Sequence, residues 1–298
     1  DRPYSIDGWR LDVAADLGHS PEMNHRFWRD FRKVVKEANP DALILAEHYG
    51  DATTWLSGDQ WDTVMNYDAF MEPVSWFLTG LEKHSERKDD HLLHNSQAFM
   101  CSMLSNMSRM QTGSLYAAMN ELSNHDHSRF LTRTNRVVGR LYKPEDAEDA
   151  EIGVNYGTFR SGAVIQMTWP GAPTIYYGDE AGVFGWTDPD NRRTFPWGKE
   201  DLELTEFHRY LTGIRNRTPA FRRGALKPLL AENGVIAYGR FDADGQGVVV
   251  VNSEDYSQRI RIPVWEAEVN GDFMDRVMAT DAERYNAGTV QYPVTDGV

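Results

Sequence analysis

The 298-residue sequence predicts an α/β fold with a parallel sheet, followed by a small all-β region. Three observations predict it. Strand and helix patterns alternate through roughly the first 217 residues, which is typical of βα units. Residues 42–46 are short and wholly apolar, as expected of a parallel strand buried on both faces. From about residue 221, short runs of alternating polarity replace this pattern.

The elements of the α/β region can be assigned in order along the chain. Strands are expected at residues 6–13, 42–46, 63–67, 117–122 and 173–177. Helices are expected from the N-cap Ser20 to Asn39-Pro40, and at residues 69–80, 91–111, 157–168 and 201–217, with a charged loop near 143–151. An apolar stripe at helical spacing marks the first helix, namely Phe27, Phe31, Val34, Val35 and Ala38.

The C-terminal region is expected to form an antiparallel β-sandwich. Val235–Phe241 and Gly247–Val251 alternate in polarity, and Asp242-Ala-Asp-Gly245 between them is a hairpin signal. We therefore divide the chain into an α/β domain at 1–220 and an all-β domain at 221–298.

Composition excludes several classes of protein. The net charge of −14 argues against nucleic-acid binding, and nothing approaches 18 consecutive apolar residues, so no membrane helix is expected. Cys101 is the single cysteine, which excludes an internal disulfide and favours the cytoplasm. Because Cys101 lies in an apolar run, we expect it to be buried and inert.

Three carboxylates lie at or just beyond the ends of predicted strands: Asp12, Glu47 and Asp126. In a parallel α/β barrel the C-terminal ends of the strands form the active-site face, so these three acids could converge. Converging acids suit glycoside cleavage, in which one carboxylate is ionised and another holds a proton. Taken singly, each acid is better explained as a solvated or helix-capping residue. Arg10 shares a strand face with Asp12 and could keep it ionised, and His125 could donate to a sugar hydroxyl.

Four segments resemble the α-amylase family of glycoside hydrolases in order and spacing. They are Asp7-Gly-Trp-Arg-Leu-Asp-Val-Ala14, Leu45-Ala-Glu-His48, Leu122-Ser-Asn-His-Asp126 and Gly171-Ala-Pro-Thr-Ile-Tyr-Tyr-Gly-Asp-Glu180. The resemblance implies that Asp12 is the nucleophile, Glu47 the general acid/base and Asp126 the third carboxylate. It also implies that Arg10 and His125 support the sugar at the cleaved bond, and that the configuration is retained.

Finer features resemble the neopullulanase and cyclomaltodextrinase branch. Asp188-Pro-Asp-Asn-Arg192 is similar to that branch's Asp-Pro-x-x-Arg loop, which implies that Asp188 and Arg192 bind a sugar on the non-reducing side. Tyr49 falls where the branch often carries an aromatic that stacks on the leaving-side sugar. A plain surface ion pair for Asp188 and Arg192, and ordinary loop packing for Tyr49, are the alternatives.

The resemblance also implies that the chain starts at the fourth strand of a (β/α)8 TIM barrel and contains strands 4–8. We therefore expect exposed, adhesive edges at residues 6–12 and 173–177, and little or no hydrolysis of starch or cyclodextrin by the isolated chain. No cofactor and no metal ligand is assigned, and a structural calcium in the full-length protein and an oligomer are left open.

The expected partner is an α-glucan, and the expected activity is retaining hydrolysis of α-1,4-glucans. An α-1,6-glucosidase or transglucosidase of the same family is a second candidate. A non-catalytic glucan-binding relative is a third, but the presence of all three acids counts against it.

Overall fold

Five short parallel strands form the framework of the computed structural model, which describes residues 5–141, 144–278, 291–296 and 298. The strands are β1 (Gly8–Leu11), β2 (Leu43–Ala46), β3 (Thr63–Val64), β4 (Met119–Asn120) and β5 (Ala172–Pro173). Pairing is parallel for β1–β2, β2–β3 and β4–β5, and an isolated parallel bridge between Met65 and Met119 continues the series from β3 to β4. The expected parallel order is confirmed, so the C-terminal ends of these strands lie on one side.

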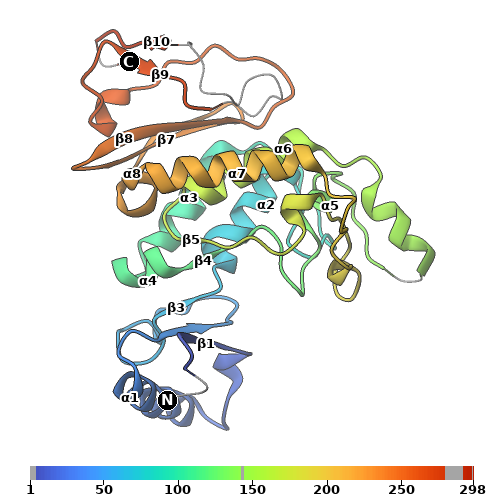
Figure 1. Ribbon diagram of the computed structural model, residues 1–298, viewed down its shortest axis with the longest axis vertical. Helices are drawn as coiled ribbons and strands as arrows, with labels where there is room; N and C mark the ends of the chain where they lie inside the picture. The colour runs from blue at the N-terminus through green and yellow to red at the C-terminus, as the bar shows by residue number, and fades with distance from the viewer. Residues whose placement is uncertain (1–4, 142–143, 279–290, 297) are drawn as a thin grey trace.

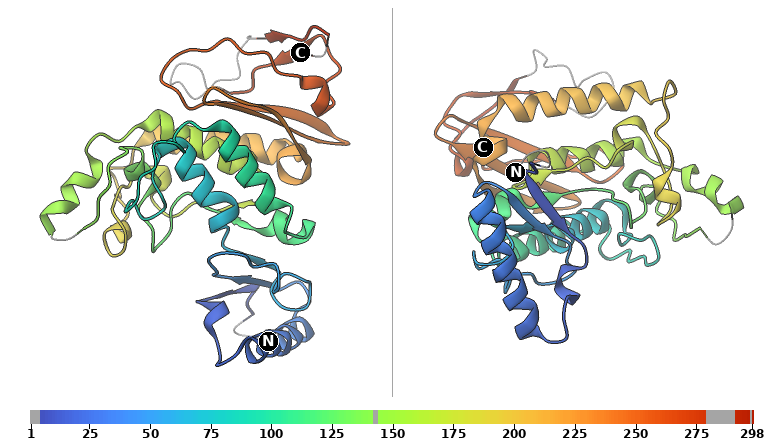
Figure 2. Two further views of the ribbon diagram at one scale, coloured as in Figure 1. Left: turned by 180° about the vertical axis from the view of Figure 1, so that it is seen from behind. Right: turned by 60° about the horizontal axis from the view of Figure 1, so that its bottom comes forward.

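Helix α1 (Pro21–Ala38) follows β1 and has the expected ends. The Ser20 hydroxyl accepts a hydrogen bond from the Met23 N–H at 3.2 Å, which satisfies one of the free donors of the first turn. The helix ends at Asn39-Pro40, as expected. With β1, β2 and β3 it forms an N-terminal lobe that has its own core and is set apart from the helical body in Figure 2.

The remaining helices build the helical body, which extends upward from β4 and β5 in Figure 1, with α4 beside β4. They are α2 (Glu72–Thr79), α3 (Ser96–Met107), α4 (Thr112–Ala117), α5 (Phe130–Arg133), α6 (Tyr156–Thr168), α7 (Leu202–Arg217) and α8 (Pro219–Arg223). Helices α6 and α7 match their predictions closely, and the Asp201 carboxylate caps α7 by accepting from the Leu204 N–H. No helix in the described ranges is long and apolar enough to cross a bilayer.

Three predicted strands keep only two residues each. The strand predicted at 117–122 is reduced to β4, because its first residue still belongs to α4. The strand predicted at 63–67 is reduced to β3, which is followed by a π-helix (Tyr67–Met71). The strand predicted at 173–177 is reduced to β5. Side-chain amides add hydrogen bonds to the backbone pairing here. The Asn120 amide accepts from the Asn66 amide at 2.7 Å and donates to the Pro170 carbonyl, and the Gln166 amide donates to the Asn120 and Thr174 carbonyls.

The charged segment expected to be a loop is a 3-10 helix at Pro144–Glu151, and residue 143 lies outside the described residues. Proline at its first position and the alanines and glutamates that follow favour helical backbone. The predicted loop is therefore wrong over the described residues.

The C-terminal region contains the antiparallel strands β6 (Ala225–Glu232), β7 (Val235–Asp242) and β8 (Gly245–Asn252). The predicted hairpin is confirmed, because Asp242 pairs with Gly245 across a two-residue loop. One face of this sheet joins the core of the helical body, and the other packs on a 3-10 helix at Val264–Ala267. A second sheet pairs β9 (Phe273–Asp275) with β10 (Gln291–Pro293), and the sandwich stays a prediction.

The burial predicted for Cys101 is wrong. Cys101 is exposed, because α3 turns Phe99, Met100 and Met103 into the core and the helix rotates by about 100° per residue. The apolar stripe of α1 is also largely exposed. Phe27 and Val34 are on the surface, and the helix buries Asn24, Trp28 and Val35 instead.

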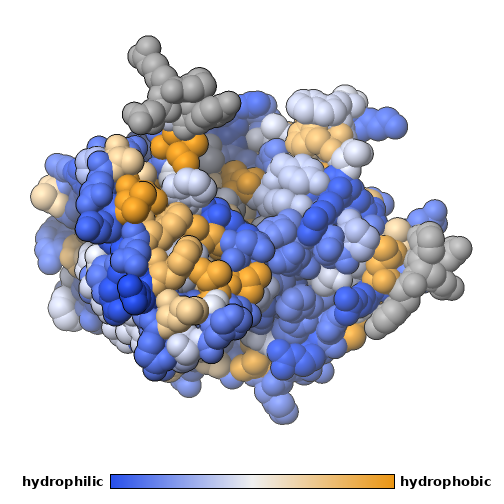
Figure 3. Space-filling model, turned by 90° about the horizontal axis from the view of Figure 1, so that it is seen from below, coloured by the Kyte–Doolittle hydropathy of each residue, from blue (hydrophilic) through white to orange (hydrophobic). Residues whose placement is uncertain are grey.

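The exposed stripe of α1 continues onto the edge strand β1. The Trp9 ring packs edge-on against Phe31 at 5.7 Å, and Phe27 stacks on Phe31. Ile6, Trp9 and Leu43 beside them are also exposed. Figure 3 shows hydrophobic side chains gathered on this underside of the N-terminal lobe. The observation agrees with an adhesive edge at 6–12, but adhesion itself stays a prediction.

Candidate active site

Arg10 joins two of the predicted catalytic acids at the C-terminal ends of β1 and β2. Its guanidinium forms a close ion pair with Asp12 through Nη1, and its Nη2 lies 3.0 Å from Glu47 Oε2. The hydrogen bond from Arg10 and its positive charge lower the pKa of Asp12. Asp12 is therefore an ionised carboxylate with an open face, since 76% of its side chain is exposed.

Glu47 is the buried member of this pair, with 6% of its side chain exposed. Its Oε2 accepts a hydrogen bond from the Val13 N–H at 3.1 Å, and the Tyr67 hydroxyl donates to Oε1 at 3.5 Å. Val13 has left-handed backbone (φ 42°, ψ 43°), which is strained for a β-branched residue. The turn after Asp12 thus directs the Val13 N–H toward Glu47. This hydrogen bond couples the position of the Glu47 carboxylate to the backbone next to Asp12.

Asp126 forms a second charged group with three of the predicted binding residues. Its Oδ1 lies 3.5 Å from His125 Nε2 and 3.7 Å from Arg192 Nη2. Arg192 also pairs with Asp188 at 2.8 Å and donates from Nε to the His125 carbonyl at 3.0 Å. The predicted Asp188–Arg192 pair therefore does not stand alone on the surface, because it contacts the segment that carries Asp126.

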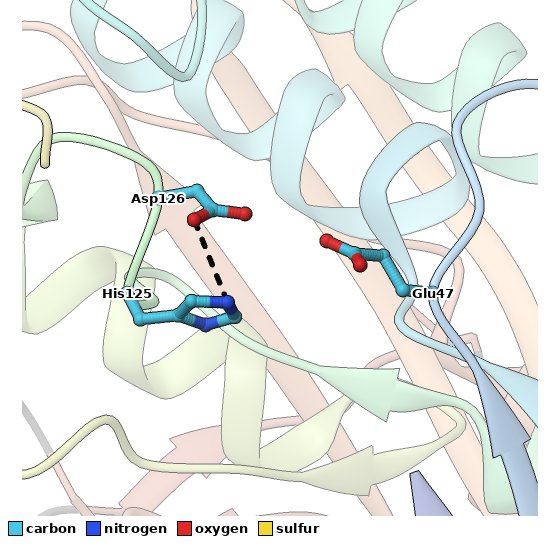
Figure 4. Close-up of side chains that lie close together, drawn as sticks. All are labelled: Glu47, His125 and Asp126. Carbon is cyan, nitrogen blue, oxygen red and sulfur yellow. Dashed lines mark ion pairs between the residues drawn. The ribbon is translucent and has the colours of Figure 1, made fainter. Parts of the chain in front are cut away.

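The two groups meet across a gap between Glu47 and Asp126. One ligand atom from each of Glu47, His125 and Asp126 lies within 4.8 Å of the others, and Figure 4 shows the two carboxylates pointing toward one another. These side chains could hold a metal ion by position alone. However, Arg10 beside Glu47 and Arg192 beside Asp126 already supply positive charge, so we assign no metal here.

Tyr49 lies at the rim of the same gap. Its ring stacks on the Tyr67 ring with centroids 4.7 Å apart, and its hydroxyl shares a hydrogen bond of 3.1 Å with His127 Nε2. Burial and the negative charges of Asp126 and Glu47 raise the pKa of Tyr49, so its phenol stays neutral. The structure brings Tyr49 to the site, with one side of its ring taken by Tyr67.

Comparison with known proteins decides the family. The family profile described as "Alpha amylase, catalytic domain" matches residues 2–291. The chain belongs to this α-amylase family. All four segments that suggested it lie within the matched range.

Relatives in this family include enzymes with several names. The chain is 33% identical to an amylopullulanase of Thermoanaerobacterium saccharolyticum over 98% of its own length and 23% of the relative's. It is 36% identical to neopullulanase 2 of Thermoactinomyces vulgaris, and the match covers 88% of this chain and 39% of the relative. The structure of a debranching enzyme from Nostoc punctiforme superposes with a TM-score of 0.74 at 28% identity, covering 91% of this chain and 53% of that one. The chain thus spans about half of that structure and less of the curated relatives.

A buried network beneath the α-amylase-family carboxylates escaped the sequence analysis. Glu121, only 1% exposed, accepts a hydrogen bond from the Asn124 amide at 2.8 Å. The Asn124 amide nitrogen also lies 3.2 Å from the Tyr67 hydroxyl, and its oxygen accepts from the Asp126 and His127 N–H groups, each at 3.0 Å. The network therefore touches the Glu47 side through Tyr67 and the Asp126 side through the backbone. The available signal was a glutamate inside an apolar strand pattern.

Burial sets the protonation of this network. It raises the pKa of Glu121 to about 8, so Glu121 is a neutral acid at pH 7. Burial, with the positive charges around it, lowers the pKa of His127 to about 2, so the ring is neutral. Burial also raises the pKa of Tyr67. The floor of the site is thus uncharged, and Asp12 and the arginines Arg10 and Arg192 carry charge above it.

Proposed function

We propose that this chain carries the catalytic carboxylates of a retaining hydrolase of α-glucans, with α-1,4 linkages as its substrate. The observation that supports it best is the Arg10 guanidinium bridging exposed Asp12 and buried Glu47, with Asp126 across a short gap. Double displacement requires an ionised carboxylate as nucleophile and a second carboxyl group as general acid/base, and an open, ionised carboxylate beside a buried one suits these two roles.

In the first step an Asp12 oxygen attacks the anomeric carbon while the glycosidic bond breaks. Glu47 gives its proton to the departing oxygen, and a covalent glycosyl ester forms on Asp12. Arg10 holds Asp12 ionised before the attack. In the second step Glu47 removes a proton from water, the water oxygen attacks the anomeric carbon, and the Asp12 carboxylate is released.

Asp126 and its neighbours hold the sugar in this proposal. Asp126 accepts hydrogen bonds from hydroxyls of the sugar at the cleaved bond, and His125 donates a hydrogen bond to a hydroxyl of the same sugar. Asp188 and Arg192 bind the sugar on its non-reducing side, and Tyr49 packs on the leaving side. The same proposal takes β1 to β5 as strands 4–8 of a (β/α)8 barrel at 1–220, followed by the all-β domain at 221–298.

The names of the relatives give the candidate substrates. Amylopullulanase, neopullulanase and cyclomaltodextrinase indicate starch-type glucans, pullulan and cyclodextrins. Rates on pullulan, cyclodextrin and isomaltose, compared side by side, separate an α-1,4-acting hydrolase from an α-1,6-glucosidase or transglucosidase.

The substitution Asp12→Asn in the full-length protein tests the mechanism. It removes the nucleophile with little change of shape, and we expect kcat to fall by roughly a thousandfold or more. Far-UV circular dichroism confirms that the variant is folded. A loss of less than about tenfold would show that Asp12 is not the nucleophile.

A further inference from the structure

Glu121 is a buried acid next to the site, and the proposed reaction does not use it. It directly follows β4 and is 1% exposed, and its Oε1 accepts a hydrogen bond from the Asn124 amide at 2.8 Å. Burial keeps Glu121 protonated at pH 7, so it adds no negative charge to the floor of the site. Burying a carboxyl group costs free energy that an apolar side chain of similar size does not incur, so Glu121 is costly unless its hydrogen bond matters.

The Asn124 side chain makes all four hydrogen bonds that an amide can make. Its oxygen accepts from the Asp126 and His127 N–H groups, each at 3.0 Å. Its nitrogen donates one hydrogen to Glu121 and the other to the Tyr67 hydroxyl oxygen, at 2.8 and 3.2 Å. Asn124 is 2% exposed, so water does not replace a bond that is lost here. The orientation of the amide is therefore fixed from both ends.

This orientation decides the direction of the next hydrogen bond, at Tyr67. Because the Tyr67 hydroxyl oxygen accepts from Asn124, its single hydrogen is left for another acceptor. Glu47 Oε1 lies 3.5 Å away and Met65 Sδ lies 3.4 Å away. A thioether is a weak acceptor, and Met65 Sδ already faces Arg10 Nη2 at 3.4 Å. The Tyr67 hydrogen therefore turns toward the Glu47 carboxyl group.

The segment that carries Asp126 is also held from its other side. The Asn191 amide donates to the Asn124 and His127 carbonyls, at 3.0 and 2.8 Å. These two contacts stay in place if the Asn124 side chain loses a partner. The looser end of the network is then the Tyr67 hydroxyl, which has no such second support from the backbone of this segment.

We propose that Glu121 is a positioning residue of the reaction. By holding the Asn124 amide, it directs the Tyr67 hydroxyl toward Glu47. The proposal rests on the proposed function, in which Glu47 is the general acid/base. Proton transfer needs its partners within hydrogen-bond reach, so a small displacement of Glu47 slows both steps and leaves the sugar-binding side chains in place. Loss of Glu121 therefore lowers kcat rather than raising KM.

A double-mutant cycle on the full-length protein tests this proposal, with maltohexaose as substrate. Glu121→Leu should lower kcat by about fivefold to tenfold and change KM by less than about twofold. Tyr67→Phe should lower kcat by about tenfold. If Glu121 acts through Tyr67, the double variant also loses about tenfold, whereas independent effects would multiply to about fiftyfold to a hundredfold. Glu121→Gln keeps an acceptor and should restore kcat to within about twofold of wild type.

Tyr238→Phe is the matched control, because it also removes a buried tyrosine hydroxyl. That hydroxyl shares a 2.6 Å hydrogen bond with Thr168 and touches none of the carboxylates, so kcat should stay within about twofold of wild type. If Glu121→Leu does not fold, Asn124→Asp takes its place in the cycle. An aspartate keeps the shape and accepts from both backbone N–H groups, but it cannot donate to Tyr67.

The outcomes separate the positioning role from the reaction. Multiplied losses in the cycle, or an unchanged kcat for Glu121→Leu, overturn the role of Glu121 and leave the proposed function standing. If wild-type protein hydrolyses no α-glucan, the proposed function fails, and the same cycle is followed by urea unfolding. Non-additive changes in the free energy of unfolding then support the link from Glu121 to Tyr67, and additive changes overturn it.

Discussion

Glu121 gives the sharpest prediction, because a buried acid that is neutral when folded must lose its proton after unfolding at neutral pH. Its pKa is raised from 4.5 to about 8 by burial. Folding therefore takes up a proton between these two values. The stabilising contribution is fully present below pH 4.5 and is lost as the pH rises through 8. At about 1.36 kcal/mol per pH unit, the loss is about 5 kcal/mol, a large part of a typical stability of about 5–15 kcal/mol.

The substitution Glu121→Gln replaces the neutral acid by an amide of the same shape that does not titrate. We expect the free energy of unfolding of wild-type protein to fall, relative to this variant, by about 5 kcal/mol between pH 4 and pH 9. Urea unfolding at a series of pH values measures it. Glu206→Gln on the exposed face of α7 is the control, and its curve should run parallel to that of wild type.

The reasoning would be refuted if the wild-type and Glu121→Gln curves stayed parallel within about 1 kcal/mol over this range. That result would mean that Glu121 is ionised in the folded protein, stabilised by a partner. The kcat of two variants separates the effect of the Glu121 hydrogen bond from that of its charge. Glu121→Leu removes the acceptor of the Asn124 amide and should lower kcat, whereas Glu121→Gln keeps an acceptor and should retain it.

Three further outcomes are expected. Asn24→Ala should destabilise the protein by about 1–3 kcal/mol in urea unfolding, because the Asn24 amide donates to the carbonyls of Ala14, Ala15 and Leu17 below the Asp12 turn. Ser20→Ala should cost about 1 kcal/mol through loss of the α1 cap, and an unchanged midpoint would contradict the capping role. Tyr67→Phe should lower kcat/KM by roughly tenfold with little change in far-UV circular dichroism, since it removes the hydroxyl that reaches Glu47 and Asn124; full activity would show that this hydroxyl is idle.

The parallel framework could be predicted because its signals are local. Residues 42–46 are apolar at every position, and Ser20-Pro21 and Asn39-Pro40 mark helix ends through their own backbone chemistry. The carboxylates could be predicted for the same reason, since each lies at or just beyond the end of a strand pattern. Their roles came from the family resemblance rather than from the spacing, and they stay proposals.

The errors arose where tertiary contacts override local pattern. Residues 117–122 look like a strand by composition, yet only two of them form a strand, and the Asn66, Asn120 and Gln166 side chains make further hydrogen bonds around it. No local signal announces these contacts. The exposure of Phe27 and Val34 is similar, because helical spacing identifies a stripe but not the surface it faces.

The buried network explains why only part of the site, the three carboxylates, could be predicted from the sequence. Asp12 and Glu47 belong to a lobe with its own core, whereas Asp126 belongs to the helical body. The two halves are joined by the Met65–Met119 bridge, the Asn66–Asn120 amide pair, and Tyr67 between Glu47 and Asn124. A motif search finds the three acids, since each lies at or just beyond the end of a strand within a recognisable segment. The distance between the acids instead depends on the neutral residues that join the two halves. Their importance is apparent only in the structure, where the two cores are seen together.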